Sequence, residues 1–183
     1  MADQRPIVVL DRDGVINHDS PDYIRSADAF TPIPGSLDAI GRLCAAGFRL
    51  AVATNQSALA RGYFTVETLT QMHEKLRGLL PPGASLDPIV FCPHHPNDRC
   101  ACRKPQPGML LDIAARLGRA PEALTFVGDS ATDIEAARRA GARGVLVRTG
   151  NGVAHLEAGR IPADVAVYDD LAAVATALIA RTT

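Results

Sequence analysis

An apolar run at residues 7–10 ends directly at the acidic motif Asp11-Arg12-Asp13-Gly14. The run reads Ile-Val-Val-Leu, and a short, wholly apolar segment rich in β-branched residues is typical of a strand buried in a parallel sheet. Open α/β sheets bind their ligands in the crevice beyond the carboxyl ends of the strands. The motif therefore indicates a ligand site directly after the first strand, and Gly14 allows the chain to turn away from it.

Asp11 and Asp13 are two carboxylates one residue apart. Such groups repel each other unless a proton or a cation lies between them. The pair suits one carboxylate as a nucleophile and the other as an acid/base, with a magnesium ion between them and a phosphate. A single Asp-x-Asp-Gly can also be an ordinary turn, so the rest of the chain has to decide.

The remaining sequence alternates between strand and helix patterns. Expected strands lie at residues 7–10, 50–54, 89–92, 124–127, 144–147 and 165–167. Apolar residues at helical spacing predict helices over residues 37–44, 66–79, 109–117, 134–140 and 171–179. The expected helix boundaries are Thr65 as an N-cap and Gly47, Gly118 and Gly141 as C-terminal stops. This alternation predicts the α/β class, with a doubly wound, Rossmann-like parallel sheet and helices on both faces.

Length and charge narrow the classes of protein that the chain can belong to. We expect a single domain over residues 1–183, and the formal net charge of -1 argues against a nucleic-acid-binding surface. No apolar stretch approaches the length of a membrane span. Residues 1–6, ahead of the first strand, are too few and too polar for a signal peptide, which favours a cytoplasmic protein.

Polar clusters follow four of the predicted strands, and in a doubly wound sheet these strand ends converge. The clusters are Asp11 with Asp13, Thr54 to Gln56, Arg103 to Pro105, and Gly128 to Asp133. Simpler explanations exist for these clusters. For example, Asp129 and Asp133 could serve merely as a helix cap, and Lys104 could be a solvated surface cation. All of these simpler readings would have to hold together, so the set favours one site.

With these four motifs in order over essentially its whole length, the chain resembles the haloacid dehalogenase superfamily of aspartate-nucleophile phosphatases. The resemblance implies that Asp11 attacks phosphorus and forms an aspartyl-phosphate. Asp13 would protonate the leaving oxygen and then accept a proton from the hydrolytic water. Thr54 and Lys104 would hold the phosphoryl oxygens.

The same resemblance implies a Mg²⁺ site built from Asp11, Asp129 and the backbone carbonyl of Asp13, with Asp133 orienting the metal site. Members of the superfamily often carry an inserted cap domain. The 40 residues between Asp13 and Thr54 and the 49 between Thr54 and Lys104 are too few for a large cap. Substrate specificity would therefore come from the loops at residues 17–26, 55–63 and 92–104.

Residues 92–102 contain three cysteines and two histidines, a density that favours a small zinc-binding loop. The expected ligands are Cys92, His94, Cys100 and Cys102, and four protein ligands make the Zn²⁺ structural. His95 in place of His94, or a set of buried or redox-active thiols without metal, are the alternatives. Cys44 falls on a helical apolar stripe and is expected to be a packed thiol.

Within the superfamily, several stretches look like the D-glycero-D-manno-heptose 1,7-bisphosphate phosphatases: residues 11–17, 54–57, 60–65, 92–96, 102–105 and 107–109. That family removes the C7 phosphate from a small phosphorylated sugar during assembly of activated heptose for lipopolysaccharide core. The resemblance implies that Arg103 recognises the substrate. The sugar site would be lined by Asp19, Asp22, Asn55, Gln56 and Ser57.

Other assignments stay open on the sequence. The short zinc loop also resembles the related histidinol-phosphate phosphatases, and Ser130 stands where some heptose enzymes have Lys. Rivals of another class are a zinc-containing nucleic-acid-binding module and a receiver-type signalling domain. Near-zero net charge disfavours the former, and an acid/base at Asp13 disfavours a lasting aspartyl-phosphate. We expect a monomer without nucleic-acid or membrane partners; Arg61 could be a binding or a surface residue.

Overall fold

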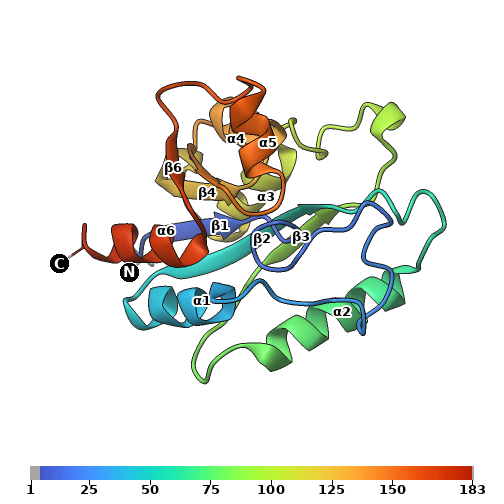
Figure 1. Ribbon diagram of the computed structural model, residues 1–183, viewed down its shortest axis with the longest axis horizontal. Helices are drawn as coiled ribbons and strands as arrows, with labels where there is room; N and C mark the ends of the chain where they lie inside the picture. Colours follow the sequence, from blue (N-terminus) through green and yellow to red (C-terminus); the bar gives the residue numbers. More distant parts are fainter. Residues whose placement is uncertain (1–4, 183) are drawn as a thin grey trace.

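The fold is a six-stranded, wholly parallel sheet in a computed structural model that describes residues 5–182. Residues 1–4, on which the expectation about a signal peptide partly rests, lie outside the described residues. The strands are β1 (Ile7–Leu10), β2 (Arg49–Asn55), β3 (Ile89–Cys92), β4 (Leu124–Gly128), β5 (Arg143–Val147) and β6 (Ala166–Tyr168). Their order is β3-β2-β1-β4-β5-β6 (Figure 1), so the predicted doubly wound, Rossmann-like sheet is confirmed.

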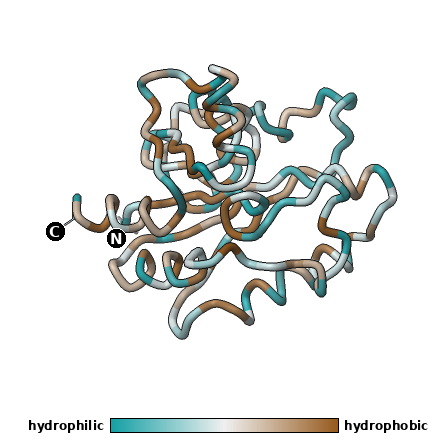
Figure 2. The backbone as a smooth tube through the Cα atoms, viewed as in Figure 1, coloured by the Kyte–Doolittle hydropathy of each residue, from teal (hydrophilic) through white to brown (hydrophobic). Residues whose placement is uncertain are grey.

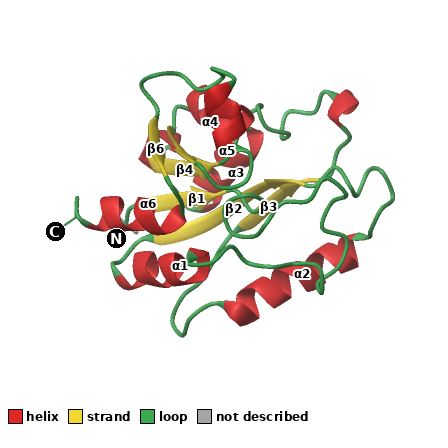
Figure 3. Ribbon diagram, viewed as in Figure 1, coloured by secondary structure: helices red, strands yellow, loops and turns green. Residues whose placement is uncertain are grey.

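Within residues 5–182, six α-helices and two short 3₁₀ helices accompany the strands, and the last helix follows β6. They are α1 (Ser36–Ala45), α2 (Val66–Leu79), η1 (Pro96–Asp98), α3 (Gly108–Arg116), η2 (Pro121–Ala123), α4 (Ala131–Ala140), α5 (Gly152–Glu157) and α6 (Leu171–Ile179). Helices α1, α2 and α6 cover one face of the sheet, and α3 and α4 cover the other (Figures 1 and 3). No helix within residues 5–182 is long and apolar enough to span a membrane.

The two faces follow from the alternation of side chains along a strand. In β1, Val8 and Leu10 pack into the core under α1, α2 and α6, whereas Ile7 and Val9 pack against α3 and α4. A strand buried on both sides has to be apolar at every position, which explains the apolar run at residues 7–10. Figure 2 shows the same contrast, with hydrophobic strands inside and helices of alternating character outside.

Element boundaries agree with the sequence to within about one residue, except that α4 begins at Ala131, three residues before its expected start. Thr65 caps α2 by accepting a hydrogen bond from the backbone N–H of Thr68, as predicted. Helix α5 was not predicted, because only Gly152 of its six residues is buried and it has no apolar stripe for a sequence pattern to reveal. No inserted domain interrupts the described chain between β1 and β3, so the predicted absence of a large cap is confirmed.

The strand order places the ligand crevice. It reverses between β1 and β4, where the connections from the two strands leave in opposite directions and open a crevice at their carboxyl ends. The backbone N–H of Asp11 donates to the carbonyl of Val127 (2.9 Å), so β1 and β4 stay paired up to the crevice. The loops that follow β1, β2 and β3 gather on the right of Figure 1, at this end of the sheet.

His73 in α2 is a buried titratable group beneath this end of the sheet. Its ring lies 6.4 Å from the ring of Phe91, and its side chain is 6% exposed. Burial, together with the positive charges of Arg12 and Arg77, lowers its pKa to about 4. An unfolded histidine titrates near pH 6.5, so the native protein holds His73 neutral where the unfolded chain is already protonated.

We expect this difference to cost stability as the pH falls. Because the pKa of His73 is lower in the native protein than in the unfolded chain, its contribution to the free energy of unfolding is complete above about pH 6.5. This contribution, about 3 kcal/mol, is lost as the pH falls from about 6.5 to about 4. Urea denaturation at both pH values gives the free energy of unfolding of the wild type and of His73→Gln. The difference between the two proteins in how this free energy changes with pH is the contribution of His73. Equal pH dependence in both proteins would exclude a neutral, buried His73.

Candidate active site

Lys104 is the centre of a buried charge cluster at the strand ends. Its Nζ lies 2.8 Å from Oδ2 of Asp11 and 2.8 Å from Oδ1 of Asp133, and it donates to the carbonyl of Ala53 (3.1 Å). Burial by itself lowers the pKa of Lys104, but the charges of Asp11 and Asp133 outweigh it and raise the pKa above its usual range. Lys104 is therefore a fixed positive charge and not a surface cation.

Asp11 follows β1 and is held on both carboxylate oxygens. Oδ2 faces Lys104, and Oδ1 accepts a hydrogen bond from the backbone N–H of Arg12 (2.7 Å). Burial raises the pKa of Asp11 well above its usual range; Lys104 opposes this shift, and Asp133 and Asp129 add to it. The side chain has one orientation and faces the other acids of the cluster.

Asp129 follows β4 and enters the same cluster between two glycines. A Cβ on Gly14 would lie 2.1 Å from Oδ2 of Asp129, and a Cβ on Gly150 would lie 2.2 Å from the same atom. Both glycines have positive φ (83° and 58°), so two turns of the chain can approach this carboxylate closely only without side chains.

Asn151 also holds Asp129, and the sequence analysis missed it. Its backbone N–H (2.8 Å) and its side-chain Nδ2 (3.2 Å) both donate to Oδ2 of Asp129. Asn151 lies in the loop after β5, so the rule that ligands gather at strand ends could have found it. Burial and the charge of Asp133 raise the pKa of Asp129 to about 6, against the hydrogen bonds from Asn151.

The cluster contains more negative than positive charge. Oxygens of Asp11, Asp129 and Asp133 lie within 4.8 Å of one another, and a single ammonium, that of Lys104, balances only part of their charge. Carboxylate oxygens are the ligands that Mg²⁺ takes in proteins. The donor set and its excess of negative charge fit a divalent cation.

Asp133 is already engaged by neighbouring groups of the chain. It forms a capping box at the start of α4, where its Oδ2 accepts from the N–H (3.0 Å) and Oγ (2.6 Å) of Ser130, and its Oδ1 faces Lys104. Asp133 therefore caps α4 and at the same time belongs to the acidic cluster. Asp133 accepts two hydrogen bonds besides its ion pair with Lys104, one more than Asp11 accepts besides its own.

Asp13 points away from this acidic cluster and binds a different set of donors. Its carboxylate accepts hydrogen bonds from Arg12, from Nδ2 of Asn17 (2.8 Å) and from Nε2 of Gln56 (3.0 Å). Gln56 Nε2 also donates to Oγ1 of Thr54 (2.9 Å). Gln56 thus connects the predicted acid/base to the predicted phosphate-binding hydroxyl.

Asn55 fixes the backbone at Lys104. Its Nδ2 donates to the carbonyl of Lys104 (3.2 Å), and its Oδ1 accepts from the N–H of Lys104 (3.1 Å). The side chain thereby reproduces the hydrogen-bond pattern of a neighbouring strand. This contact connects the end of β2 to the loop after β3 and gives Asn55 a structural role that the sequence did not suggest.

A cavity of about 400 Å³ opens above the cluster and contains most of the predicted site. Of the residues predicted to bind substrate, the structure brings these to the cavity wall: Asp19, Asn55, Gln56, Ser57 and Arg103. Asp22 is not part of this wall, and its backbone carbonyl accepts a hydrogen bond from Nε of Arg25. Arg61 does not line it either. Tyr23, a non-glycine residue with φ of 63°, is a wall residue that the sequence analysis missed.

Arg103 is the cationic group of the wall that remains available. Its Nη1 is buried and has no hydrogen-bond partner within residues 5–182. An unpaired buried donor is costly unless a ligand satisfies it. The guanidinium is thus suited to bind an anionic group in the cavity.

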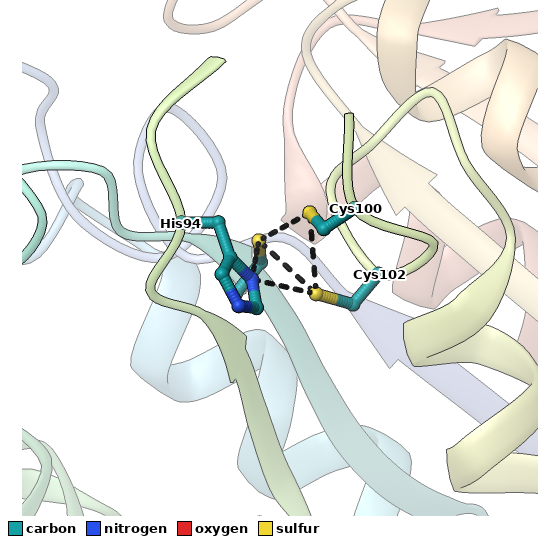
Figure 4. Close-up of side chains that lie close together, drawn as sticks. His94, Cys100 and Cys102 are labelled. Atoms are coloured by element: carbon teal, nitrogen blue, oxygen red, sulfur yellow. Dashed lines mark hydrogen bonds between the residues drawn. The ribbon is translucent and has the colours of Figure 1, made fainter. Parts of the chain in front are cut away.

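The predicted zinc ligands form a second, separate cluster beside Lys104. Figure 4 shows the ring of His94 facing the thiols of Cys100 and Cys102. The Sγ atoms of Cys92, Cys100 and Cys102 are 3.3–3.6 Å apart, and Nδ1 of His94 lies 3.2 Å from Cys102 Sγ. Disulfide sulfurs would be about 2.05 Å apart, whereas sulfurs around a tetrahedral zinc with bonds of about 2.3 Å are about 3.8 Å apart. The spacing fits a closed zinc site.

His95 takes a different role from His94. Its Nδ1 accepts a hydrogen bond from the N–H of Asn97, and its backbone N–H donates to Oδ2 of Asp98, which together cap η1. The structure therefore brings His94 and not His95 into the thiol cluster. Cys44 is half-buried on α1, and its Sγ contacts the carbonyl of Ser85.

Comparisons with known proteins agree with this geometry. A HAD-hydrolase-like family model matches residues 101–174. The D-glycero-beta-D-manno-heptose-1,7-bisphosphate 7-phosphatase of Pseudomonas putida is 51% identical over 94% of this chain and 99% of its own length. The Pseudomonas aeruginosa enzyme of the same name is 51% identical over 96% of this chain and 98% of its own. The chain belongs to the D-glycero-β-D-manno-heptose-1,7-bisphosphate 7-phosphatase family.

A solved structure of this heptose phosphatase family has the same fold. The D,D-heptose 1,7-bisphosphate phosphatase of Bordetella bronchiseptica, complexed with magnesium and phosphate, superimposes with a TM-score of 0.92 at 46% identity. The alignment covers 96% of this chain and 98% of that one. The superfamily and heptose phosphatase resemblances that the motifs indicated are both confirmed.

The acidic cluster predicts that magnesium binding depends on pH. Asp129, with a pKa of about 6, is ionised above that pH and protonated below it. Protons therefore compete with Mg²⁺, and we expect the apparent dissociation constant for MgCl₂ to rise about tenfold between about pH 7 and about pH 5. Isothermal titration calorimetry at both pH values measures this dissociation constant.

Asn151→Ala sharpens this test of the metal site. Loss of the Nδ2 hydrogen bond raises the pKa of Asp129 further, so the weakening should begin at a higher pH in this variant. Arg116→Lys, on the exposed face of α3, is the matched control. A magnesium affinity that is equal at both pH values would contradict the assignment of Asp129.

The zinc loop makes a separate prediction, because Cys102 lies two residues before Lys104. Cys102→Ser should lower the zinc content and reduce phosphatase activity about 10- to 100-fold, since the backbone that presents Lys104 loses its support. Metal analysis and activity are measured on the same sample, with Cys44→Ser as control. Full activity of a folded, zinc-free variant would refute this coupling.

Proposed function

We propose that this protein is a magnesium-dependent phosphomonoesterase that removes the C7 phosphate of D-glycero-β-D-manno-heptose 1,7-bisphosphate. The observation that carries the proposal is the buried cluster of Asp11, Lys104, Asp129 and Asp133 in a chain 51% identical to enzymes of that name. The product would serve the synthesis of activated heptose for the lipopolysaccharide core.

Asp11 is the nucleophile in this proposal. Its carboxylate is fixed by Lys104 and by the N–H of Arg12, so it needs no reorientation to attack phosphorus. The attack forms an aspartyl-phosphate and expels the C7 oxygen of the sugar, and water then hydrolyses the acyl phosphate. Two easier displacements replace one difficult one.

The neighbouring residues hold charge and move protons. Asp13 donates a proton to the leaving oxygen in the first step and accepts one from water in the second. The Thr54 hydroxyl and the Lys104 ammonium bind the phosphoryl oxygens as negative charge shifts between them. Lys104 keeps its positive charge throughout, because its two acidic partners hold its pKa above the usual range.

Mg²⁺ would be held by Asp11, Asp129 and the backbone carbonyl of Asp13, and Asp133 would orient the site through Lys104 and Ser130. When bound, the ion neutralises the repulsion between phosphate and carboxylate that would otherwise oppose attack. The excess negative charge of the cluster supports this assignment. Cys92, His94, Cys100 and Cys102 would hold a structural Zn²⁺.

The substrate's second phosphate would meet Arg103. A guanidinium with an unpaired, buried Nη1 on the cavity wall matches a non-reacting phosphate far better than it matches the cationic amine of histidinol phosphate. Asp19, Asn55, Gln56 and Ser57 would line the sugar, whereas Asp22, which is not part of the cavity wall, has no part in this proposal. The reactive phosphate would lie deeper, at Lys104.

Three further parts of the proposal concern the whole protein. Residues 1–183 form one domain, the protein acts as a monomer on a small sugar phosphate, and it works in the cytoplasm. The four cysteines are free thiols, and three of them belong to the proposed zinc site. Free thiols are typical of a reducing compartment, which supports a location in the cytoplasm.

A panel of phosphate esters tests the substrate. With MgCl₂ present, we expect kcat/KM to be highest for the heptose 1,7-bisphosphate and lower for histidinol phosphate and fructose 1,6-bisphosphate. Phosphate release is measured for each ester under the same conditions. A preference for histidinol phosphate would overturn the substrate assignment and leave the chemistry intact.

Asp11→Asn tests the chemistry itself. The substitution removes the nucleophilic oxygen but keeps the size of the side chain, so activity should fall at least about 10³-fold in a folded protein. Circular dichroism verifies the fold, and Asp38→Asn, on the exposed side of α1, is the control. Near-wild-type turnover would remove Asp11 from this role.

A further inference from the structure

Arg12 is a fully buried arginine between the two acids of the first motif. Its side chain is 1% exposed, although arginine is almost never buried unless it is paired. The Nε and Nη2 atoms donate to Asp13 at 3.1 and 2.9 Å, respectively, in a two-pronged contact. The protein itself therefore supplies the partner of this cation, which is the carboxylate of Asp13.

We propose that Arg12, assisted by Asn17, is a positioning residue that fixes the carboxylate of Asp13 chiefly through Oδ1, so that Oδ2, which accepts fewer hydrogen bonds, transfers the proton. Oδ1 accepts three hydrogen bonds: from Nε (3.1 Å) and Nη2 (2.9 Å) of Arg12 and from Nδ2 of Asn17 (2.8 Å). Oδ2 accepts two, from Arg12 Nη2 (3.0 Å) and from Gln56 (3.0 Å) on the cavity wall. The inference rests on the proposed acid/base role of Asp13.

The surroundings of Arg12 prevent its guanidinium from turning elsewhere. Nη1 contacts Sδ of Met72 (3.8 Å), and the group lies over the ring of Phe30 at 5.9 Å from its centre. This packing holds the planar fork in one orientation in a low-dielectric site, where a charged hydrogen bond is strong. Lysine offers one point charge without a fork and could not hold the carboxylate in the same way.

A misplaced Asp13 should matter only where a proton has to reach the leaving group. A sugar alkoxide is a poor leaving group and needs that proton, whereas 4-nitrophenolate leaves without one. The ratio of kcat/KM for the heptose bisphosphate to kcat/KM for 4-nitrophenyl phosphate therefore reports proton delivery. kcat/KM is the right constant because it covers the steps up to the first irreversible one, and excludes the later hydrolysis of the aspartyl-phosphate.

The decisive variant is Arg12→Lys, measured with both esters. We expect kcat/KM for the sugar ester to fall about 10- to 100-fold while the constant for 4-nitrophenyl phosphate changes little. Arg116→Lys breaks a similar arginine–aspartate contact on the exposed face of α3, and Leu76→Ala destabilises the core under α2. Both controls should leave the ratio unchanged, which separates positioning from a general loss of stability.

Asp13→Asn separates the two possible failures. If Asp13→Asn lowers the ratio and folded Arg12→Lys does not, this inference is wrong and the proposed chemistry stands. If Asp13→Asn also leaves the ratio unchanged, the acid/base role itself is wrong. Should Arg12→Lys fail to fold, Asn17→Ser removes the third hydrogen bond to Oδ1, and an unchanged ratio in that variant overturns the inference.

Discussion

The ion pairs of Lys104 are the interaction on which the site depends. One ammonium is buried between Asp11 and Asp133, and a third carboxylate, Asp129, lies close to both. Removing one partner of such a buried pair typically costs about 3–5 kcal/mol, because an uncompensated charge remains. The pairs therefore fix Asp11, the proposed nucleophile, and Asp129, the carboxylate without an ion pair to Lys104, adds the negative charge that fits Mg²⁺.

Four strands have to end at the same place for this cluster to form. Asp11 follows β1, the Asn55 side chain at the end of β2 binds both backbone groups of Lys104, and Asp129 follows β4. The loop after β3 carries Lys104 and begins with the cysteine and histidine cluster. Asp11, Lys104 and Asp129 lie in loops, and loops are held in place by what they contact. The zinc cluster and the Asn55 contact thus take over the role that regular secondary structure has elsewhere in the molecule.

Much of this arrangement was predictable from the sequence, for identifiable reasons. The sheet followed from apolar runs such as residues 7–10, and the cysteine and histidine cluster followed from the density of these residues in the segment 92–102. Helix α5 was not predicted because Gly152 is the only one of its residues that is buried. Asn151 and Tyr23 escaped because neither belongs to a motif; they reach the site through loops whose paths depend on the packed structure.

The sequence by itself determined the fold class, the order of the acidic and basic motifs, and the residue types available for phosphate and zinc. Those properties are local, because periodicity and strand-end position can be read from neighbouring residues. Only the tertiary structure decided which oxygens face which donors: that Asp13 turns to Arg12 and away from the acidic cluster, that Asn55 supports Lys104, and that His94 and not His95 joins the thiols. These choices depend on side-chain orientation across distant segments, which no spacing in the chain encodes.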